Sequence, residues 1–122
     1  MNGLTYAYIG DAYYELRIRK HLIDRKMTRV NALHKRATDF TSSVAQARII
    51  EYMIETEVID QDEVARFRNG RNTSGPGRKN VDARTYHMAT GFEALIGALY
   101  LENIARADEL VDIAIRFIER EI

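Results

Sequence analysis

Two solitary carboxylates stand out among the residues that could do chemistry. Asp11 is the only charged side chain in residues 1–14, and Glu93 is the only formally charged residue in residues 85–101. Both stretches are typical of largely buried helices, where a carboxylate without a partner is strongly unfavourable. Two carboxylates that face each other require a cation. Oxygen ligands in a chain without cysteine favour a hard ion, Mg²⁺ or Mn²⁺, of the kind that assists phosphodiester hydrolysis.

A simpler interpretation of the two acids stays open at this point. Each could pair with an arginine from another helix or reach the surface, and structural ion pairs are commoner than metal sites. Gly10 and Gly97 lie one residue before Asp11 and four residues after Glu93. Small residues there would let two backbones, or a ligand, approach closely.

The elements that position these acids are predicted to be almost entirely helical. Residues 3–25 show apolar side chains at helical spacing, and Thr28 or Asn31 can cap a second helix that runs to Asp39. Ser42 or Ser43 can cap a third helix. No strand pattern of any length appears.

The second half of the chain contains three more predicted helices. A capping box at Asp60 and Glu63 predicts a short helix to Phe67 or beyond, and residues 82–102 predict a long one. The last helix is expected from about Ala107, with an amphipathic face. Residues 69–80 are dense in Gly, Asn and Ser, so we expect them to form a functional loop and not regular structure.

The bulk composition indicates a single domain over residues 1–122. The hydrophobic fraction of 46% is ordinary for a globular protein, and a chain of 122 residues can bury only one modest core, so oligomerisation would add burial. No apolar run is long enough to span a bilayer and no signal-peptide pattern opens the chain. We therefore expect no membrane association and a cytoplasmic location.

The net charge of zero conceals a segregated distribution. Residues 17–36 hold eight basic side chains against Asp24 alone, and residues 66–87 hold six against Asp82 alone. Residues 51–63 carry six acids and no base. The pattern predicts one basic and one acidic face, although solvated helix faces that cluster by chance would look the same.

The segments around the two acids resemble the catalytic motifs of a known family. Residues 8–12 (YIGDA) and 92–101 (FEALIGALYL) resemble, in order and separation, the two motifs of ribonuclease III. The closer resemblance is to mini-ribonuclease III, a catalytic domain without a double-stranded RNA-binding domain. Full-length ribonuclease III usually has a glutamate at the position of Ala7 and an aspartate at that of Thr90. Their loss is typical of mini-ribonuclease III and leaves the number of metal ions open.

The resemblance implies an all-α, homodimeric endonuclease fold in which Asp11 and Glu93 are catalytic and bind Mg²⁺, with Mn²⁺ as an alternative. The paired sites would cut opposite strands of an RNA duplex and leave 5′-phosphate ends. The expected substrate is the stem of precursor 23S ribosomal RNA, with ribosomal-protein assistance as a further partner. The alternative function is a non-catalytic double-stranded RNA-binding module with a degenerate ribonuclease III fold.

If the chain acts on double-stranded RNA, further polar residues are predicted to bind it. The cations would meet phosphates and the asparagines 2′-hydroxyls or sugars. The predicted loop contacts are Arg71, Asn72, Lys79 and Asn80, with His34 and Lys35 as a weaker second region.

Overall fold

The protein folds into six helices, as a computed structural model shows for residues 1–76 and 81–121. In order they are α1 (Gly3–Asp24), α2 (Val30–Thr41), α3 (Ser43–Glu55), α4 (Gln61–Thr73), α5 (Ala83–Glu102) and α6 (Ile104–Glu121). The described residues contain no strand, which confirms the all-α prediction. None of these helices combines the length and the apolar character that a membrane crossing requires.

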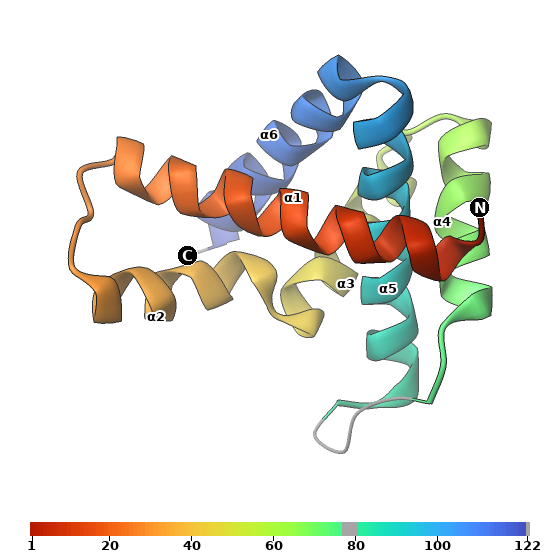
Figure 1. Cartoon of the computed structure of the whole chain (residues 1–122), viewed down its shortest axis with the longest axis horizontal. Coiled ribbons are helices and arrows are strands. Elements are labelled where there is room, and N and C mark those ends of the chain that lie inside the picture. The colour runs from red at the N-terminus through yellow and green to blue at the C-terminus, as the bar shows by residue number, and fades with distance from the viewer. Residues whose placement is uncertain (77–80, 122) are drawn as a thin grey trace.

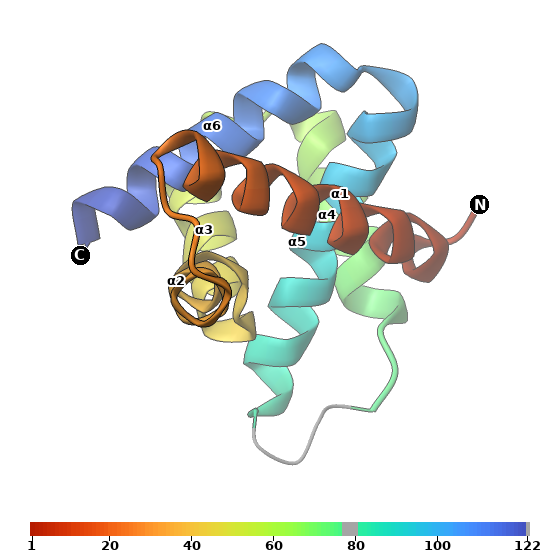
Figure 2. The ribbon, with the colours of Figure 1, turned by 60° about the vertical axis from the view of Figure 1, so that its left-hand side comes forward.

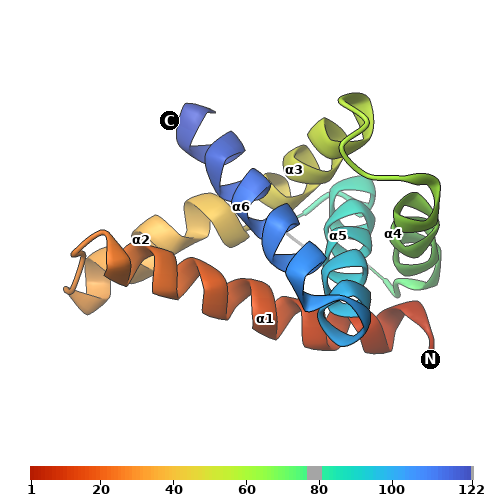
Figure 3. The ribbon, with the colours of Figure 1, turned by 90° about the horizontal axis from the view of Figure 1, so that it is seen from above.

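Helix α5 is the centre of the fold. It runs roughly perpendicular to α1, which lies across it, and α4 and α3 flank it (Figures 1 and 3). Every residue from Met88 to Leu99 except Glu93 is buried, so the burial extends to all sides of the helix. A helix that is apolar all round must be enclosed by its neighbours, because no face of it suits water.

Helices α2 and α6 both pack against α1. Figure 2 shows α6 above α1 and α2 below it. The apolar face of α6 buries Ala107, Leu110, Val111 and Ala114, as its periodicity predicts. Helix α1 therefore has two partly covered flanks and one outward face.

Local capping explains most of the helix starts. Ser42 accepts from Ala45 N at 3.1 Å, Asp82 accepts from Thr85 N at 2.9 Å, and the predicted capping box opens α4. The cap of α2 was predicted wrongly, because Arg29 holds that position and forms no side-chain cap bond. The predicted start of α6, at about Ala107, was also wrong, because the helix begins at Ile104. Asn103 precedes it, and the side chain of Asn103 accepts a hydrogen bond from Arg106 N at 3.3 Å.

Helix α4 extends into the segment that was expected to be a loop. Asn69 to Thr73 form the last turn of α4, and Gly70 within this turn is buried against other helices. A Cβ on Gly70 would lie 2.3 Å from the Cβ of Ala94, and one on Gly3 would lie 2.7 Å from the Cα of Gly70. Gly70 therefore lets α4 pack closely against α1 and α5. This tertiary packing outweighs the poor helix propensity of glycine.

Candidate active site

The backbones of α1 and α5 touch where they cross. A Cβ on Gly10 would lie 1.8 Å from the carbonyl oxygen of Glu93, and a Cβ on Gly97 would lie 1.9 Å from that of Tyr6. Only glycine permits this approach, as the sequence suggested. Asp11 directly follows Gly10, so the two candidate catalytic acids belong to the backbone segments that meet at this crossing.

The two acids differ in burial. The side chain of Asp11 is exposed and forms no hydrogen bond or ion pair with the described residues, whereas that of Glu93 is half-buried. The expectation that both occupy buried helices is therefore wrong for Asp11. The reason is that α1 buries only the stripe that faces its neighbours, which includes Gly10, Tyr14 and Ile18, and Asp11 lies beside this stripe.

Tyr14 connects the crossing to the rest of the fold. It is fully buried, its hydroxyl donates to the carbonyl oxygen of Phe40 at 2.9 Å, and its ring meets that of Phe92 edge-on at 5.1 Å. Burial raises the pKa of the Tyr14 phenol, so the group stays a neutral donor. Because Asp11 lies one turn away from Tyr14 and Glu93 follows Phe92, this side chain fixes the segments that carry both acids. The sequence analysis did not identify this support.

The positions of the two missing carboxylates are filled by packing. Ala7 is buried in a small cluster with Tyr6, Ala94 and Ala98. The hydroxyl of Thr90, also buried, donates to the carbonyl oxygen of Tyr86 at 3.1 Å within its own helix. Among the described residues no three His, Cys, Asp or Glu side chains gather closely enough to hold a metal ion.

A two-carboxylate site still fits a hard divalent ion. Mg²⁺ retains several waters in proteins and is commonly bound through one or two carboxylates. The exposure of Asp11 leaves room for such waters and for a phosphate. The donor set therefore fits Mg²⁺ with few protein ligands and does not fit an ion that needs a closed protein cage.

Helix α4 carries the predicted RNA contacts Arg71 and Asn72. Arg71 Nε donates to Asn72 Oδ1 at 3.1 Å, and its guanidinium lies 5.5 Å from the centre of the Phe67 ring. Both line a cleft of about 400 Å³ that also includes Arg84 and His87. The other two predicted loop contacts, Lys79 and Asn80, lie outside the described residues.

The weaker predicted contacts lie on α2. His34 and Lys35 are both exposed. His34 lies at the edge of a groove of about 310 Å³ between α1 and α2, which Glu15 and Thr41 also line. The structure therefore does not bring His34 or Lys35 to the α1–α5 crossing, but it leaves them accessible to a large ligand.

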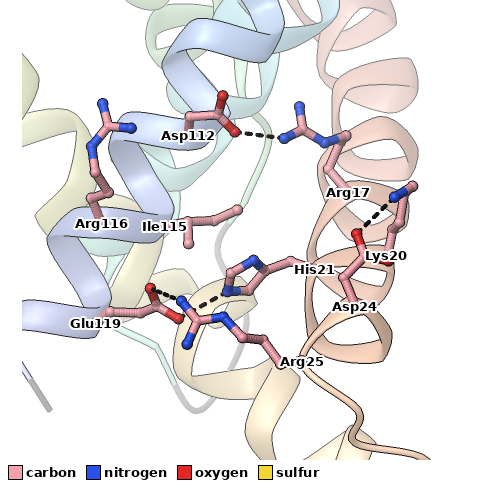
Figure 4. A pocket seen from close by; sticks show the side chains of 9 residues that line it. All are labelled: Arg17, Lys20, His21, Asp24, Arg25, Asp112, Ile115, Arg116 and Glu119. Atoms are coloured by element: carbon pink, nitrogen blue, oxygen red, sulfur yellow. Dashed lines mark hydrogen bonds and ion pairs between the residues drawn. The ribbon is translucent and has the colours of Figure 1, made fainter.

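A second charged cleft, of about 510 Å³, lies between α1 and α6, and most of its charged side chains are paired, with Arg116 as the exception among the described residues (Figure 4). Arg17 bonds to Asp112 at 2.7 Å, and both His21 and Arg25 bond to Glu119, at 2.8 and 3.2 Å. These pairs hold α6 against α1. The charges of this cleft therefore have a structural role.

The chain is similar to known proteins over almost its whole length. The Ribonuclease III domain family matches residues 4–103. The Mini-ribonuclease 3 of Acholeplasma laidlawii is 44% identical over 120 residues, which are 98% of this chain and 96% of the relative. The Mini-ribonuclease 3 of Streptococcus pneumoniae is 44% identical over 121 residues, with 98% and 94% coverage.

A solved structure is similar to this chain in its fold. An X-ray crystal structure of a Fusobacterium nucleatum protein has a TM-score of 0.83 and 27% sequence identity, and the match covers 100% of this chain and 95% of the other. The sequence match and the helical fold indicate the same family. The chain therefore belongs to the ribonuclease III family, and within it to the mini-ribonuclease III proteins.

Proposed function

We propose that the chain cleaves double-stranded RNA at a site formed by Asp11 and Glu93. Family membership makes it an endoribonuclease of the ribonuclease III type. The observation that supports this site best is the contact of Gly10 with the backbone of Glu93, next to an Asp11 that is exposed and lacks a described partner. A carboxylate with no structural partner, placed at the closest helix contact, is available to a ligand.

We propose that the carboxylate oxygens of Asp11 and Glu93 hold Mg²⁺, with Mn²⁺ as an alternative. When bound, such an ion favours phosphodiester hydrolysis by stabilising the negative charge that develops on the phosphate oxygens. Glu93 lies on the enclosed helix α5, so its backbone is fixed, whereas Asp11 faces the solvent from which a duplex must approach. With Ala7 and Thr90 in the other two positions, protein carboxylates would hold one ion firmly per site.

The RNA contacts that we propose are the polar residues predicted from the sequence. Arg71 and Asn72 on α4 would meet the backbone of the duplex together with Lys79 and Asn80, and His34 and Lys35 would meet it from α2. The substrate we propose is the double-stranded stem of precursor 23S ribosomal RNA in the cytoplasm, cut to leave 5′-phosphate ends, with a ribosomal protein as an additional partner. Support for this substrate comes from the likeness to the mini-ribonuclease III group.

A homodimer would place two such sites on opposite strands. The outward side of α1 supports this proposal, because Leu4, Tyr8 and Leu16 are 44%, 83% and 61% exposed. Exposed apolar side chains repeated along one helix are typical of an interface. Tyr8 lies one turn before Asp11, so a partner that covered it would lie beside the site.

The test is cleavage of a long RNA duplex in Mg²⁺ by the protein and by the Asp11→Asn and Glu93→Gln variants. Each variant should lose cleavage by a factor of about 10³ or more and keep most of its duplex binding, because one charge is removed and the shape is conserved. Chelation of the metal should stop the parent as well. The unfolding temperature of Asp11→Asn should match the parent, because no described residue pairs with Asp11.

Glu15→Gln is the matched control. Glu15 is one turn after Asp11 on the same helix and pairs with Arg19 at 3.5 Å. This variant should cleave like the parent. Duplex binding by the parent without any cleavage would contradict the proposal and favour a non-catalytic RNA-binding module.

A further inference from the structure

The eight basic side chains of residues 17–36 fall into two classes in the structure. Five of them bind a carboxylate, which neutralises their charge; these are Arg17, Arg19, Lys20, Arg25 and Arg36. The remaining three have no ion-pair partner among the described residues. These are Lys26, Arg29 and Lys35, which we call the tip patch.

The tip patch lies at one end of the molecule. Lys26 and Arg29 belong to the connection between α1 and α2, and Lys35 follows on the exposed side of α2 (left in Figure 1). Asp24, the end of α1, lies thirteen positions after Asp11, so at about 1.5 Å per residue the helix extends roughly 20 Å beyond Asp11. The described ends of the α4–α5 connection lie at the bottom of the same view, below the α1–α5 crossing, and the tip patch lies to the left of it.

Lys26 occupies a backbone position that normally suits glycine. Its φ is 67°, its N–H bonds to the carbonyl oxygen of Ile23 at 2.9 Å, and Met27 N bonds to that of Leu22 at 3.2 Å. These two bonds form a Schellman motif, in which glycine is the usual residue at the left-handed position. A lysine there carries a conformational cost that glycine would avoid, so the stability of the helix end does not account for the cation.

We propose that the tip patch is a second phosphate-binding region, which holds the backbone of the RNA duplex roughly 20 Å from the cleaved bond. This inference rests on the proposed function. Exposed cations without carboxylate partners gain most from phosphates, because no existing ion pair has to break. The N-terminus of α2 adds to the attraction, since Arg29 provides no side-chain cap for its first amides. The occupant is duplex RNA, the substrate that the family membership indicates.

The first experiment measures duplex binding in the Asp11→Asn background, so that no RNA is cut. A triple variant, Lys26→Gln with Arg29→Gln and Lys35→Gln, is titrated with a duplex long enough to reach the tip and with one too short to do so. The long duplex should bind about tenfold more weakly, and the slope of log affinity against log salt should fall by about one for each lost phosphate contact. Binding of the short duplex should not change.

The matched control removes the same charge from paired positions near the tip patch. A triple variant with Arg19→Gln, Lys20→Gln and Arg25→Gln loses three exposed cations that already bind carboxylates. Its binding to the long duplex should stay close to that of the parent. Equal losses in both triple variants, or equal losses with both duplexes, would show a net-charge effect and overturn the inference. If the parent bound neither duplex, the proposed function itself would fail.

Lys26→Gly provides an independent measurement. Glycine removes the cost of the left-handed backbone, so the unfolding temperature should rise by about 3–5 °C. Affinity for the long duplex should nevertheless fall about threefold, because one phosphate contact is lost. If the variant were more stable and bound the long duplex as well as the parent, Lys26 would not be part of the phosphate-binding region.

Discussion

The α1–α5 crossing and the α1–α6 cleft use charge in opposite ways. In the cleft, Arg17 binds both Asp108 and Asp112 at 2.7 Å, and Glu119 binds two partners. At the crossing there are fewer charges, and Asp11 has no described partner. The number of charged side chains therefore does not locate the site in this molecule. What distinguishes the proposed site is an uncompensated carboxylate that directly follows a glycine in backbone contact with the other helix.

The largest expected effect concerns the crossing itself. In Gly10→Ala the new Cβ would lie 1.8 Å from the carbonyl oxygen of Glu93, so α1 and α5 must separate. We expect a loss of about 3 kcal/mol or more in the free energy of unfolding, measured by urea denaturation, together with loss of cleavage. The control is Gly75→Ala, because a Cβ at Gly75 meets nothing within 4 Å. If Gly10→Ala were as stable as Gly75→Ala, the backbone contact would not define the site.

The next effect concerns the paired carboxylate of Glu63, whose contribution to the free energy of unfolding should depend on pH. Glu63 is almost buried and binds Arg106 at 2.7 Å, and this bond lowers the pKa of the Glu63 carboxyl despite the opposing effect of burial. Its stabilisation is therefore fully present above the ordinary glutamate pKa of about 4.3, and is lost as the pH falls through the lowered folded value. Glu63→Gln should cost about 2 kcal/mol at neutral pH.

That cost should shrink when unfolding is measured at successively lower pH, because the parent loses the ionised carboxylate and the variant has none to lose. Glu109→Gln is the control, since Glu109 is exposed and lies 3.5 Å from Arg106. A cost for Glu63→Gln that stayed constant down to about pH 3 would mean that the ion pair is not its source.

The smallest effect separates the cleft from the crossing. Arg17→Gln removes two bonds to carboxylates from a half-buried guanidinium, and we expect it to cost about 1–2 kcal/mol in unfolding free energy. Cleavage per folded molecule should stay unchanged. Lys20→Gln, which breaks an exposed pair with Asp24, should cost about 0.5 kcal/mol or less. A strong loss of cleavage in Arg17→Gln would contradict the division between the two regions.

Sequence reasoning succeeded where the determining interactions are local. The capping residues Ser42, Asp60 and Asp82 bond within their own first turn, so their helix starts were predictable. The enclosure of α5 followed from its apolar composition. Gly10 and Gly97 were singled out correctly, because a glycine within a turn of an isolated acid in an apolar helix indicates a close backbone approach.

Sequence reasoning failed where segments that are distant in the sequence determine the local structure. Residues 69–73 have the composition of a loop, yet they are helical because Gly70 is covered by Gly3 and Ala94. Asp11 was expected to be buried, but only the arrangement of the other helices fixes which side of α1 is covered. The basic run of residues 17–36 likewise could not reveal which cations are paired, since Asp108, Asp112 and Glu119 come from α6.

The glycine contact at the crossing also limits how this enzyme fold can vary. Where side chains separate two helices, exchanges of size can compensate one another, and the helices can shift or rotate over generations. Where two backbones are in direct contact, no side chain lies between them whose size could change to compensate for a substitution. Gly10 and Gly97 therefore fix the helix spacing, whereas Ala7, Ala94 and Ala98 beside them can be exchanged in concert. A designer who wishes to alter the proposed metal site would thus change side-chain length at Asp11 or Glu93, and leave the distance between the helices as it is.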